Sequence, residues 1–375
     1  MAATPTLYNP IVKGLSWLAR QITNHMSLGA YFEPLIQLLL PQWRSDRLRS
    51  KVQAVRQESA DMYSLIIRPN KHWQGFKAGQ HVELTVQKNG AWVSRFFTIS
   101  SSPAYFKKSG LIELTIQIQS KGQITPWLPK ALAHNSVLNI SEAQGDFCLS
   151  RYHQGLLMIA GGSGITPFRA MLQELALSRY SADSTTDKTL LYYARSSEHF
   201  LFRKELEDFS QQLPSLNVHF IDSEQQGFLS AQHLEQFCPK YKTRAVYLCG
   251  PAKMITHGRN LLTSLSVKKQ QLHYEFFGPE PIELTQKTGT NNIVFERSNK
   301  KIQSNNHTPK TLLSLAEEAN TPVMSGCRAG VCYQCICQKT SGVVFNTKTK
   351  QYSDTGQQDI QLCISVPVSD LVLEL

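Results

Sequence analysis

The sequence lacks any apolar run of the length that crosses a bilayer. Its first residues, MAATPTLYNPIVKG, also lack the basic start, apolar core and cleavage site of a secretory signal. A long block of basic residues and a nucleic-acid-binding motif are absent too, although the formal net charge is +11. We therefore expect a cytoplasmic protein with a generally basic surface and no nucleic-acid partner.

Internal repeats and low-complexity tracts are absent, and the composition is ordinary for a globular protein, with 41% apolar and 18% charged residues. There is no HExxH sequence, no Ser–His–Asp pattern and no histidine cluster of the diiron kind. The chain of 375 residues is long enough for two or three domains. The motifs that are present must therefore carry a function other than direct substrate activation.

The hydrophobic pattern changes along the chain and predicts five segments. Residues 1–48 are expected to form a helical leader, and residues 49–150 hold many short strands without helices, which predicts an antiparallel β-barrel. Strands and helices alternate over residues 151–279, the pattern of an α/β domain with a parallel sheet. Residues 280–291 are polar and read as a linker, and residues 292–375 hold strands, one helix and a cysteine-rich loop.

Five of the eight cysteines crowd the C-terminal segment, which favours a metal site over a disulfide framework. Cys327, Cys332 and Cys335 have C-x4-C-x2-C spacing, and Cys363 follows downstream. Two irons need four thiolates, and a tight loop plus one remote cysteine can supply them. Zinc sites usually show paired short spacings, so a structural zinc site is the weaker alternative. Cys337 falls outside the pattern and is expected to be a strand residue.

The segment SGCRAGVCYQC…LCIS resembles the plant-type ferredoxin domain, with the helix TLLSLAEEAN in the place where that family has one. The resemblance implies a β-grasp domain that holds a [2Fe–2S] cluster on the four cysteines. Tyr333 stands where many members have glycine, which leaves the ligands intact and alters the surface of the loop.

Residues RFFTISS, from Arg95 to Ser101, resemble the flavin signature of the ferredoxin–NADP reductase superfamily. The resemblance implies that Arg95 neutralises the flavin pyrophosphate, that Phe97 packs on the flavin and that Thr98 hydrogen-bonds near its N5 atom, where hydride arrives. Without its neighbours, the stretch would be equally consistent with an ordinary strand.

The stretch KGQIT, from Lys121 to Thr125, resembles the second flavin motif of the same superfamily. The resemblance implies that Lys121 and Gly122 form a glycine turn facing the pyrophosphate. Thr125 stands where serine is commoner in the family. The paired motifs imply FAD. FMN stays an alternative, because some relatives with this domain order use it.

The loop GGSGITP follows a predicted buried strand and opens a helix, so its amides and the helix N-terminus can face a pyrophosphate. It closely resembles the nicotinamide site of the superfamily. The resemblance assigns Gly161, Gly162, Gly164, Thr166 and Pro167 to the nucleotide, with Thr166 nearest the nicotinamide.

The tripeptide Cys249-Gly250-Pro251 matches the second nicotinamide motif of the superfamily. It places Cys249 beside the nicotinamide ring in a steering role and not as a nucleophile. The alternative is a small buried residue at a strand end. Glu275, at the end of the last strand of this domain, is expected to help shield the flavin. Thr98, Cys249 and Glu275 are thus the predicted catalytic residues.

The choice between NADPH and NADH rests on the segment after the second strand of the α/β domain. A 2′-phosphate needs fixed positive charge and hydroxyl donors, and Arg195, Ser196 and Arg203 can supply them. The stretch RSSEHFLFRKEL is similar to the NADPH-selecting segment of diflavin reductases. We therefore predict NADPH, and NADH stays an alternative because such residues also begin helices in NADH-using relatives.

Together the motifs predict an NAD(P)H-dependent ferredoxin-type oxidoreductase. A flavin converts a two-electron hydride donor into one-electron steps for the cluster, so the three motif groups fit one path. The domain order resembles the reductases of phthalate dioxygenase and vanillate demethylase.

With no substrate-activating site, the acceptor is expected to be another protein. The leader and the tail resemble reductases of membrane-bound acyl (stearoyl-CoA type) desaturases, which makes a desaturase the predicted acceptor. The apolar leader segment YFEPLIQLLLPQW is a candidate for peripheral membrane contact, although packing on its own barrel accounts for it as well. The alternatives are an oxygenase as acceptor, or a non-catalytic redox sensor.

Overall fold

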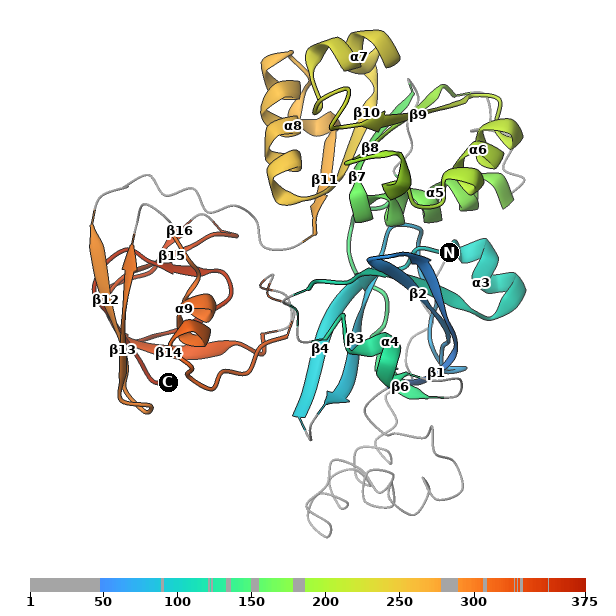
Figure 1. The fold of residues 1–375 in the computed structure, drawn as a ribbon. Helices are drawn as coiled ribbons and strands as arrows, with labels where there is room; N and C mark the ends of the chain where they lie inside the picture. Colours follow the sequence, from blue (N-terminus) through green and yellow to red (C-terminus); the bar gives the residue numbers. More distant parts are fainter. Residues whose placement is uncertain are drawn as a thin grey trace, which may run out of the picture.

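The structure is a computed structural model that describes residues 48–88, 91–120, 122, 124–132, 136–149, 155–177, 186–277, 289–305, 309–326, 328, 330, 333–349 and 351–375. The predicted helical leader and most of the predicted linker therefore lie outside the described residues, as do Lys121, Cys327 and Cys332. Three lobes are visible in Figure 1: a barrel domain, a parallel-sheet domain and a C-terminal domain.

The barrel domain is an antiparallel sheet of six strands in the order β4-β3-β6-β1-β2-β5. Alternating burial along β3 shows why these residues form strands with one face on the core. A bridge between Ile99 and Leu114 joins the ends of the strand order and closes the sheet. The strands are β1 (Leu48–Ser59), β2 (Met62–Arg68), β3 (His81–Lys88), β4 (Ala91–Thr98), β5 (Ile112–Gln117) and β6 (Val137–Ile140).

The expectation of a barrel without helices was wrong, because α3 (Pro103–Ser109) and α4 (Leu128–Ala131) lie between its strands. The Ser102 hydroxyl accepts the Tyr105 N–H at the start of α3, Pro103 begins the helix, and Gly110 ends it with φ 70°. These are standard helix start and stop signals, and their short spacing was missed among the strands.

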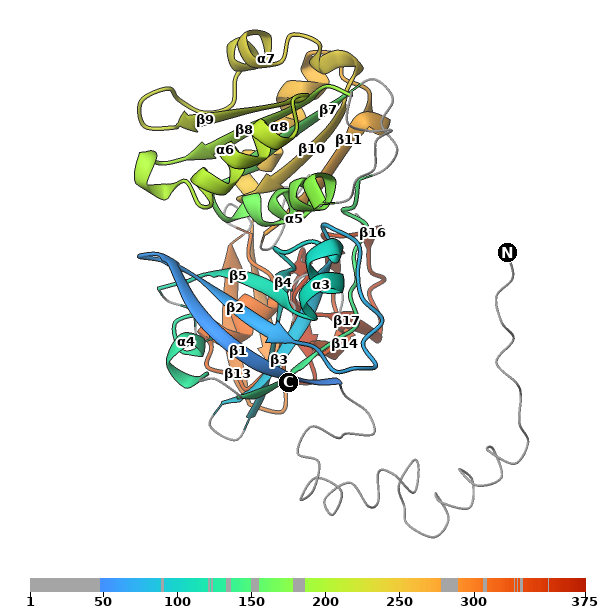
Figure 2. The same cartoon turned by 90° about the vertical axis from the view of Figure 1, so that its right-hand side faces the viewer.

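The parallel-sheet domain has five parallel strands in the order β11-β10-β7-β8-β9. Alternate residues of β7 and β8 pack into two cores, one with α5 and α6 and one with α7 and α8, so helices cover both faces (Figure 2). The strands are β7 (Leu156–Gly161), β8 (Lys188–Ala194), β9 (Leu216–Asp222), β10 (Ala245–Gly250) and β11 (Leu272–Phe276). The helices are α5 (Ile165–Leu177), α6 (Arg203–Gln212), α7 (Ala231–Phe237) and α8 (Ala252–Ser264).

The C-terminal domain has a mixed five-stranded sheet in the order β13-β12-β19-β14-β17, in which β12 and β19 run parallel. Helix α9 (Leu312–Glu318) buries its leucines in the core of this domain. A second sheet of this domain has three strands in the order β16-β15-β18. The strands of the two sheets are β12 (Thr290–Phe295), β13 (Lys300–Asn305), β14 (Ile336–Ser341), β15 (Val344–Asn346), β16 (Gln351–Tyr352), β17 (Gln358–Gln361), β18 (Ser365–Pro367) and β19 (Leu371–Leu373). Strand β12 begins two residues inside the predicted linker, since Thr290 pairs with Asn305. The predicted fold class of all three domains is confirmed.

Among the helices in the described part of the chain, none is both long and apolar enough to cross a membrane.

Candidate functional site

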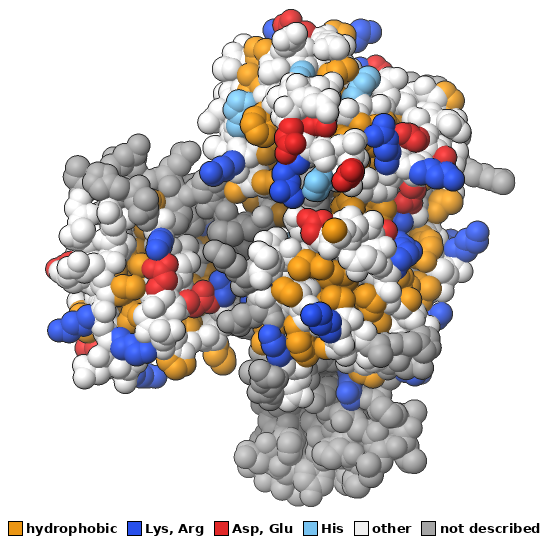
Figure 3. All heavy atoms as spheres, in the orientation of Figure 1, with side chains coloured by type: hydrophobic (Ala, Val, Ile, Leu, Met, Phe, Trp, Pro, Cys, Tyr) orange, Lys and Arg blue, Asp and Glu red, His pale blue; other side chains and the backbone are white. Residues whose placement is uncertain are grey.

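A cavity of about 740 Å³ lies where the carboxyl ends of the parallel strands face the barrel domain. It is lined by Gly161 at the end of β7 and Gly162 just after it, by Pro251 after β10, and by Asp61 and Gln117 of the barrel. Open parallel sheets bind ligands at this edge, so the predicted glycine loop is in the expected place. In the space-filling view, charged side chains gather along the line where the two lobes meet (Figure 3).

The glycine loop packs directly against the predicted cysteine motif. A Cβ atom on Gly164 would lie 2.2 Å from the Cys249 carbonyl oxygen, so only glycine allows this approach. Thr166 is buried, and its hydroxyl donates to the Ser163 carbonyl at 3.1 Å. Pro167 follows it in the first turn of α5. The two nicotinamide motifs thus lie side by side at one edge of the sheet.

Basic side chains dominate the charged groups that line the cavity. Among the described residues that line it, the basic ones are Arg195, His199, Lys253 and His257, and Asp61 is the single carboxylate. This donor set fits the phosphate groups of a dinucleotide. Lys253 and His257 were missed at the sequence level, although they follow the Cys249-Gly250-Pro251 motif with the i, i+4 spacing of one helix face.

The other predicted 2′-phosphate contacts lie at or beyond the edge of the cavity. The Ser196 hydroxyl is 2.8 Å from Nδ1 of His199, which itself lines the cavity. Arg203 does not line it. Its Nε donates to Glu207 at 3.0 Å, and its guanidinium lies over the Phe220 ring.

The predicted flavin strand is β4, the first strand in the order of the barrel sheet. Thr98 is buried at its end, and Phe97 packs partly against the barrel core. Arg95 donates from Nη1 to the Ser94 carbonyl at 2.7 Å and to the Gly326 carbonyl, in the C-terminal domain, at 3.2 Å. Arg95 therefore contacts the residue immediately before the predicted cluster ligand Cys327.

The second flavin motif forms a tight turn. The Gly122 N–H donates to the Gln119 carbonyl at 2.7 Å, and the Thr125 hydroxyl accepts the Gln119 N–H at 2.9 Å. The Thr125 carbonyl accepts the hydroxyl of the buried Tyr63 at 3.0 Å, which fixes the turn to the barrel.

Cys249 and Glu275 are direct neighbours across strands β10 and β11. Burial, reinforced by the Glu275 carboxylate, raises the pKa of the Cys249 thiol well above its ordinary value, which agrees with a steering role and not a nucleophilic one. Oε1 of Glu275 is 3.3 Å from Nδ1 of His81 in the barrel, while Oε2 is buried without a hydrogen-bond partner among the described residues. A buried acceptor left open between two domains fits a cofactor that brings a donor.

Two of the four predicted cluster ligands are described, and one of them, Cys363, accepts a backbone hydrogen bond as a metal-bound thiolate does. Cys335 and Cys363 are buried, and the Gly330 N–H donates to Sγ of Cys363 at 3.3 Å. Gly330 has φ +66°, and a Cβ there would lie 2.6 Å from the Ile364 side chain. Cys337 lies in β14 opposite Ile360, so its prediction as a strand residue is confirmed.

Comparison with known families finds three matches along the chain. The family model of the oxidoreductase FAD-binding domain matches residues 49–148, and that of the oxidoreductase NAD-binding domain matches residues 158–260. The model of the 2Fe-2S iron-sulfur cluster binding domain matches residues 295–368. Each match covers one lobe of the structure.

Curated relatives span most of the chain. An NADPH oxidoreductase of Mycobacterium tuberculosis (strain ATCC 25618 / H37Rv) is 25% identical and covers 95% of this chain and 92% of its own. The NADH oxidoreductase HCR of Escherichia coli (strain K12) is 27% identical, over 87% of this chain and 97% of its own length. A glycine betaine monooxygenase reductase subunit of Chromohalobacter salexigens is 25% identical, over 80% of this chain and 87% of its own length.

The solved structure of phthalate dioxygenase reductase resembles the chain as a whole. The two align with a TM-score of 0.58 at 20% identity, over 88% of this chain and 98% of that one. At this identity the likeness shows a shared fold.

Proposed function

We propose that this chain, an electron-transfer reductase that joins FAD-binding, NAD-binding and 2Fe-2S cluster binding domains, uses NADPH as its electron donor. The proposed electron acceptor is the protein component of an oxygenase. The predicted cofactors FAD, NAD(P)H and [2Fe–2S] are confirmed at the level of these domains. The observation that carries the proposal is the basic cavity at the glycine loop, on a chain that also holds the buried cluster thiols.

Bound FAD supplies the chemistry that joins a two-electron hydride donor to a one-electron cluster. The chain's own residues have the tasks of binding and orientation. We propose that Gly161, Gly162 and Gly164 admit the pyrophosphate, and that Thr98, Cys249 and Glu275 border the reacting atoms. Phe97, Lys121, Gly122 and Thr125 are proposed to hold the flavin, and Thr166, Pro167, Gly250 and Pro251 the nicotinamide side.

The electron path is tested by anaerobic titration of the purified protein with NADPH and, separately, with NADH. Absorbance reports the flavin, and electron paramagnetic resonance reports the reduced cluster. We expect flavin bleaching followed by the cluster signal, at a lower concentration of NADPH than of NADH. Flavin bleaching without a cluster signal, in protein that contains iron and sulfide, would contradict the proposed path. Negligible turnover with artificial acceptors despite full cofactor loading would instead support the redox-sensor alternative.

The preference for NADPH is proposed to come from Arg195 and Lys253, which place fixed positive charge in the cavity. Losing one charged hydrogen bond to a 2′-phosphate should raise the KM for NADPH by about tenfold or more in Arg195→Ala and Lys253→Ala. The KM for NADH should change by less than about twofold, because NADH lacks this phosphate. Arg203→Ala is the matched control, since Arg203 lies off the cavity; a larger effect there than at Arg195 would contradict this assignment.

An oxygenase component is the proposed acceptor because one relative is named a glycine betaine monooxygenase reductase subunit. A membrane-bound acyl desaturase is the second candidate. It rests on the resemblance of the leader, which lies outside the described residues, and of the C-terminal tail. Supplying reduced protein to each purified acceptor separates the two. If removing residues 1–45 leaves coupling to a desaturase intact, the proposed docking and membrane role of the leader is wrong.

A further inference from the structure

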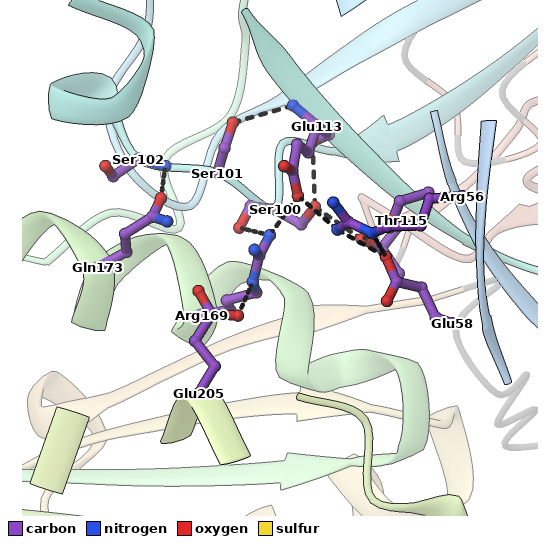
Figure 4. Close-up of polar contacts among 11 residues, drawn as sticks. Arg56, Glu58, Ser100, Ser101, Ser102, Glu113, Thr115, Arg169, Gln173 and Glu205 are labelled. Atoms are coloured by element: carbon purple, nitrogen blue, oxygen red, sulfur yellow. Dashed lines mark hydrogen bonds and ion pairs between the residues drawn. The ribbon is translucent and has the colours of Figure 1, made fainter. Parts of the chain in front are cut away.

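Helix α5 reaches from the parallel-sheet domain to the barrel with three polar side chains, of which Figure 4 shows Arg169 and Gln173. Arg169 donates from Nη1 to the Ser100 carbonyl at 3.1 Å. Gln173 accepts the Ser102 N–H at 2.7 Å, and Glu174 accepts the Ala104 N–H at 2.7 Å. One face of a single helix therefore holds a short segment of barrel backbone at three points.

Both sides of this contact adjoin the proposed cofactor residues. Ser100 lies two residues after Thr98 of the flavin strand, and Arg169 lies three residues after Thr166 of the glycine loop. A second link runs from the loop itself, because the Ser163 hydroxyl donates to Gln117 at the end of β5 at 3.2 Å. The separation of the two cofactor segments is thus set by contacts of α5 that lie outside the cavity lining, together with one link between Ser163 and Gln117, which both line the cavity.

Arg169 is the centre of the contact, and it is buried. Its Nη1 also donates to Glu113 of β5 at 2.8 Å, and its Nε donates to Glu205 of α6 at 2.7 Å. Arg56 contacts the same Glu113 oxygen at 3.2 Å, and the Phe202 ring lies 4.4 Å from the Arg169 guanidinium carbon. A planar guanidinium can donate in these fixed directions at once, whereas a lysine ammonium cannot reproduce the fork.

Stability alone is a weak reason for such a network. A buried ion pair can often be replaced by apolar side chains without loss, whereas its directional bonds fix one geometry among several. Here those bonds join three elements: β5 of the barrel, and α5 and α6 of the parallel-sheet domain.

We propose that Arg169 is a positioning residue that holds the glycine loop at the distance from the flavin strand that hydride transfer requires. The inference rests on the proposed function and deepens it, because it names a residue that acts on the reaction through Ser100 and Glu113. A small misplacement of reacting groups slows transfer far more than it weakens binding.

The test compares Arg169→Lys with Arg244→Lys in flavin-loaded protein. Arg244 is a matched control, because it is equally buried but pairs with Asp187 and Thr189 inside the parallel-sheet domain. We expect Arg169→Lys to slow single-turnover flavin reduction by about tenfold or more, with the Kd for NADP⁺ changed by less than about twofold. Arg244→Lys should lower the thermal midpoint and keep the rate. An unchanged rate in Arg169→Lys would overturn the proposal.

Hydrogen exchange gives a second readout that does not depend on turnover. Arg169→Lys should speed amide exchange both in residues 98–104 and in residues 161–167, and Arg244→Lys in neither. If Arg169→Lys fails to fold, Gln173→Ala replaces it in this experiment, because that change removes an acceptor without leaving a buried charge. Gln173→Ala should speed exchange in the same two segments by a smaller amount. Exchange that changes only in residues 168–177 of α5 would overturn the proposal, even if neither nucleotide reduces the flavin and the proposed function itself fails.

Discussion

The carboxylate of Glu113 lies between the guanidinium groups of Arg169 and Arg56, at the junction of the barrel and parallel-sheet domains. Burial alone would raise the pKa of Glu113, but the two guanidinium groups outweigh it and hold the pKa below the ordinary value of 4.5. The folded state therefore binds this proton more weakly than the unfolded chain does. Its stabilising effect is complete above the unfolded pKa and is lost as the pH falls through the lower folded pKa.

Glu113→Gln should thus destabilise the protein in a pH-dependent way. At pH 7 we expect a loss of about 3 kcal/mol in the free energy of unfolding of the affected domains, since one partner of a buried ion pair is removed. The difference from the unsubstituted protein should shrink below about pH 4.5, where the unfolded Glu113 binds a proton. Urea unfolding at several pH values measures it, and a difference that stays constant from pH 7 to pH 3 would contradict the argument.

Two buried cysteines of the C-terminal domain allow a matched test of the cluster ligands. Cys363 accepts an N–H bond from Gly330, as a metal-bound thiolate does, whereas Sγ of Cys337 lies beside the Gln338 carbonyl of its own strand, 3.5 Å away. We predict that Cys363→Ser loses the visible absorbance of the cluster together with its iron and sulfide, and that Cys337→Ser keeps all three. Retention of the cluster in Cys363→Ser would remove that residue from the ligand set.

At the scale of elements, α3 has no fully buried residue, so its caps should contribute much of its local stability beside the Glu174 contact and the packing of Phe106. Removing the Ser102 hydroxyl, which accepts the Tyr105 N–H at 3.0 Å, should cost about 1 kcal/mol. Ser109→Ala, which removes a hydroxyl bonded only within the same short segment, should cost less than about 0.5 kcal/mol. Chemical unfolding measures both, and equal losses would mean that the cap is not what holds α3.

The sequence predicts elements well where burial is periodic or complete. Strands β7 and β8 are buried throughout, and so their continuous apolar runs already indicate a two-sided parallel sheet. Cysteine spacing likewise predicts a cluster loop before any fold is known. Helix α3 was missed because seven residues are too few for a periodic pattern, and only its caps identify it.

The site was predictable only as far as its motifs reach along the chain. Lys253 and His257 line the cavity because the turn after β10 directs α8 toward it. The direction of α8 cannot be predicted from the residue types alone. Arg169 pairs with Glu113, 56 residues away, so its role arises only when two domains pack together. Arg203 has the residue type expected of a 2′-phosphate contact, but its side chain donates to Glu207 of its own helix, α6.

At the scale of the whole molecule, Arg95 connects the barrel to the C-terminal domain. Its Nη1 atom donates to the Ser94 and Gly326 carbonyls, and the flavin signature that begins at Arg95 is proposed to bind the flavin pyrophosphate. One side chain can therefore hold the flavin and the loop before Cys327 together. A contact that spans both would keep the two redox groups close in the same molecule.

We predict that Arg95→Gln both lowers flavin content and speeds amide exchange in residues 322–328, because the bond to the Gly326 carbonyl is weakened. Arg297→Gln is the matched control, since Arg297 is an exposed cation that pairs with Glu374 inside the C-terminal domain. Exchange is measured with and without added FAD, so that loss of flavin is separated from loss of the contact. If exchange in residues 322–328 follows flavin occupancy alone, Arg95 serves only the flavin, and the position of the C-terminal domain must depend on other contacts.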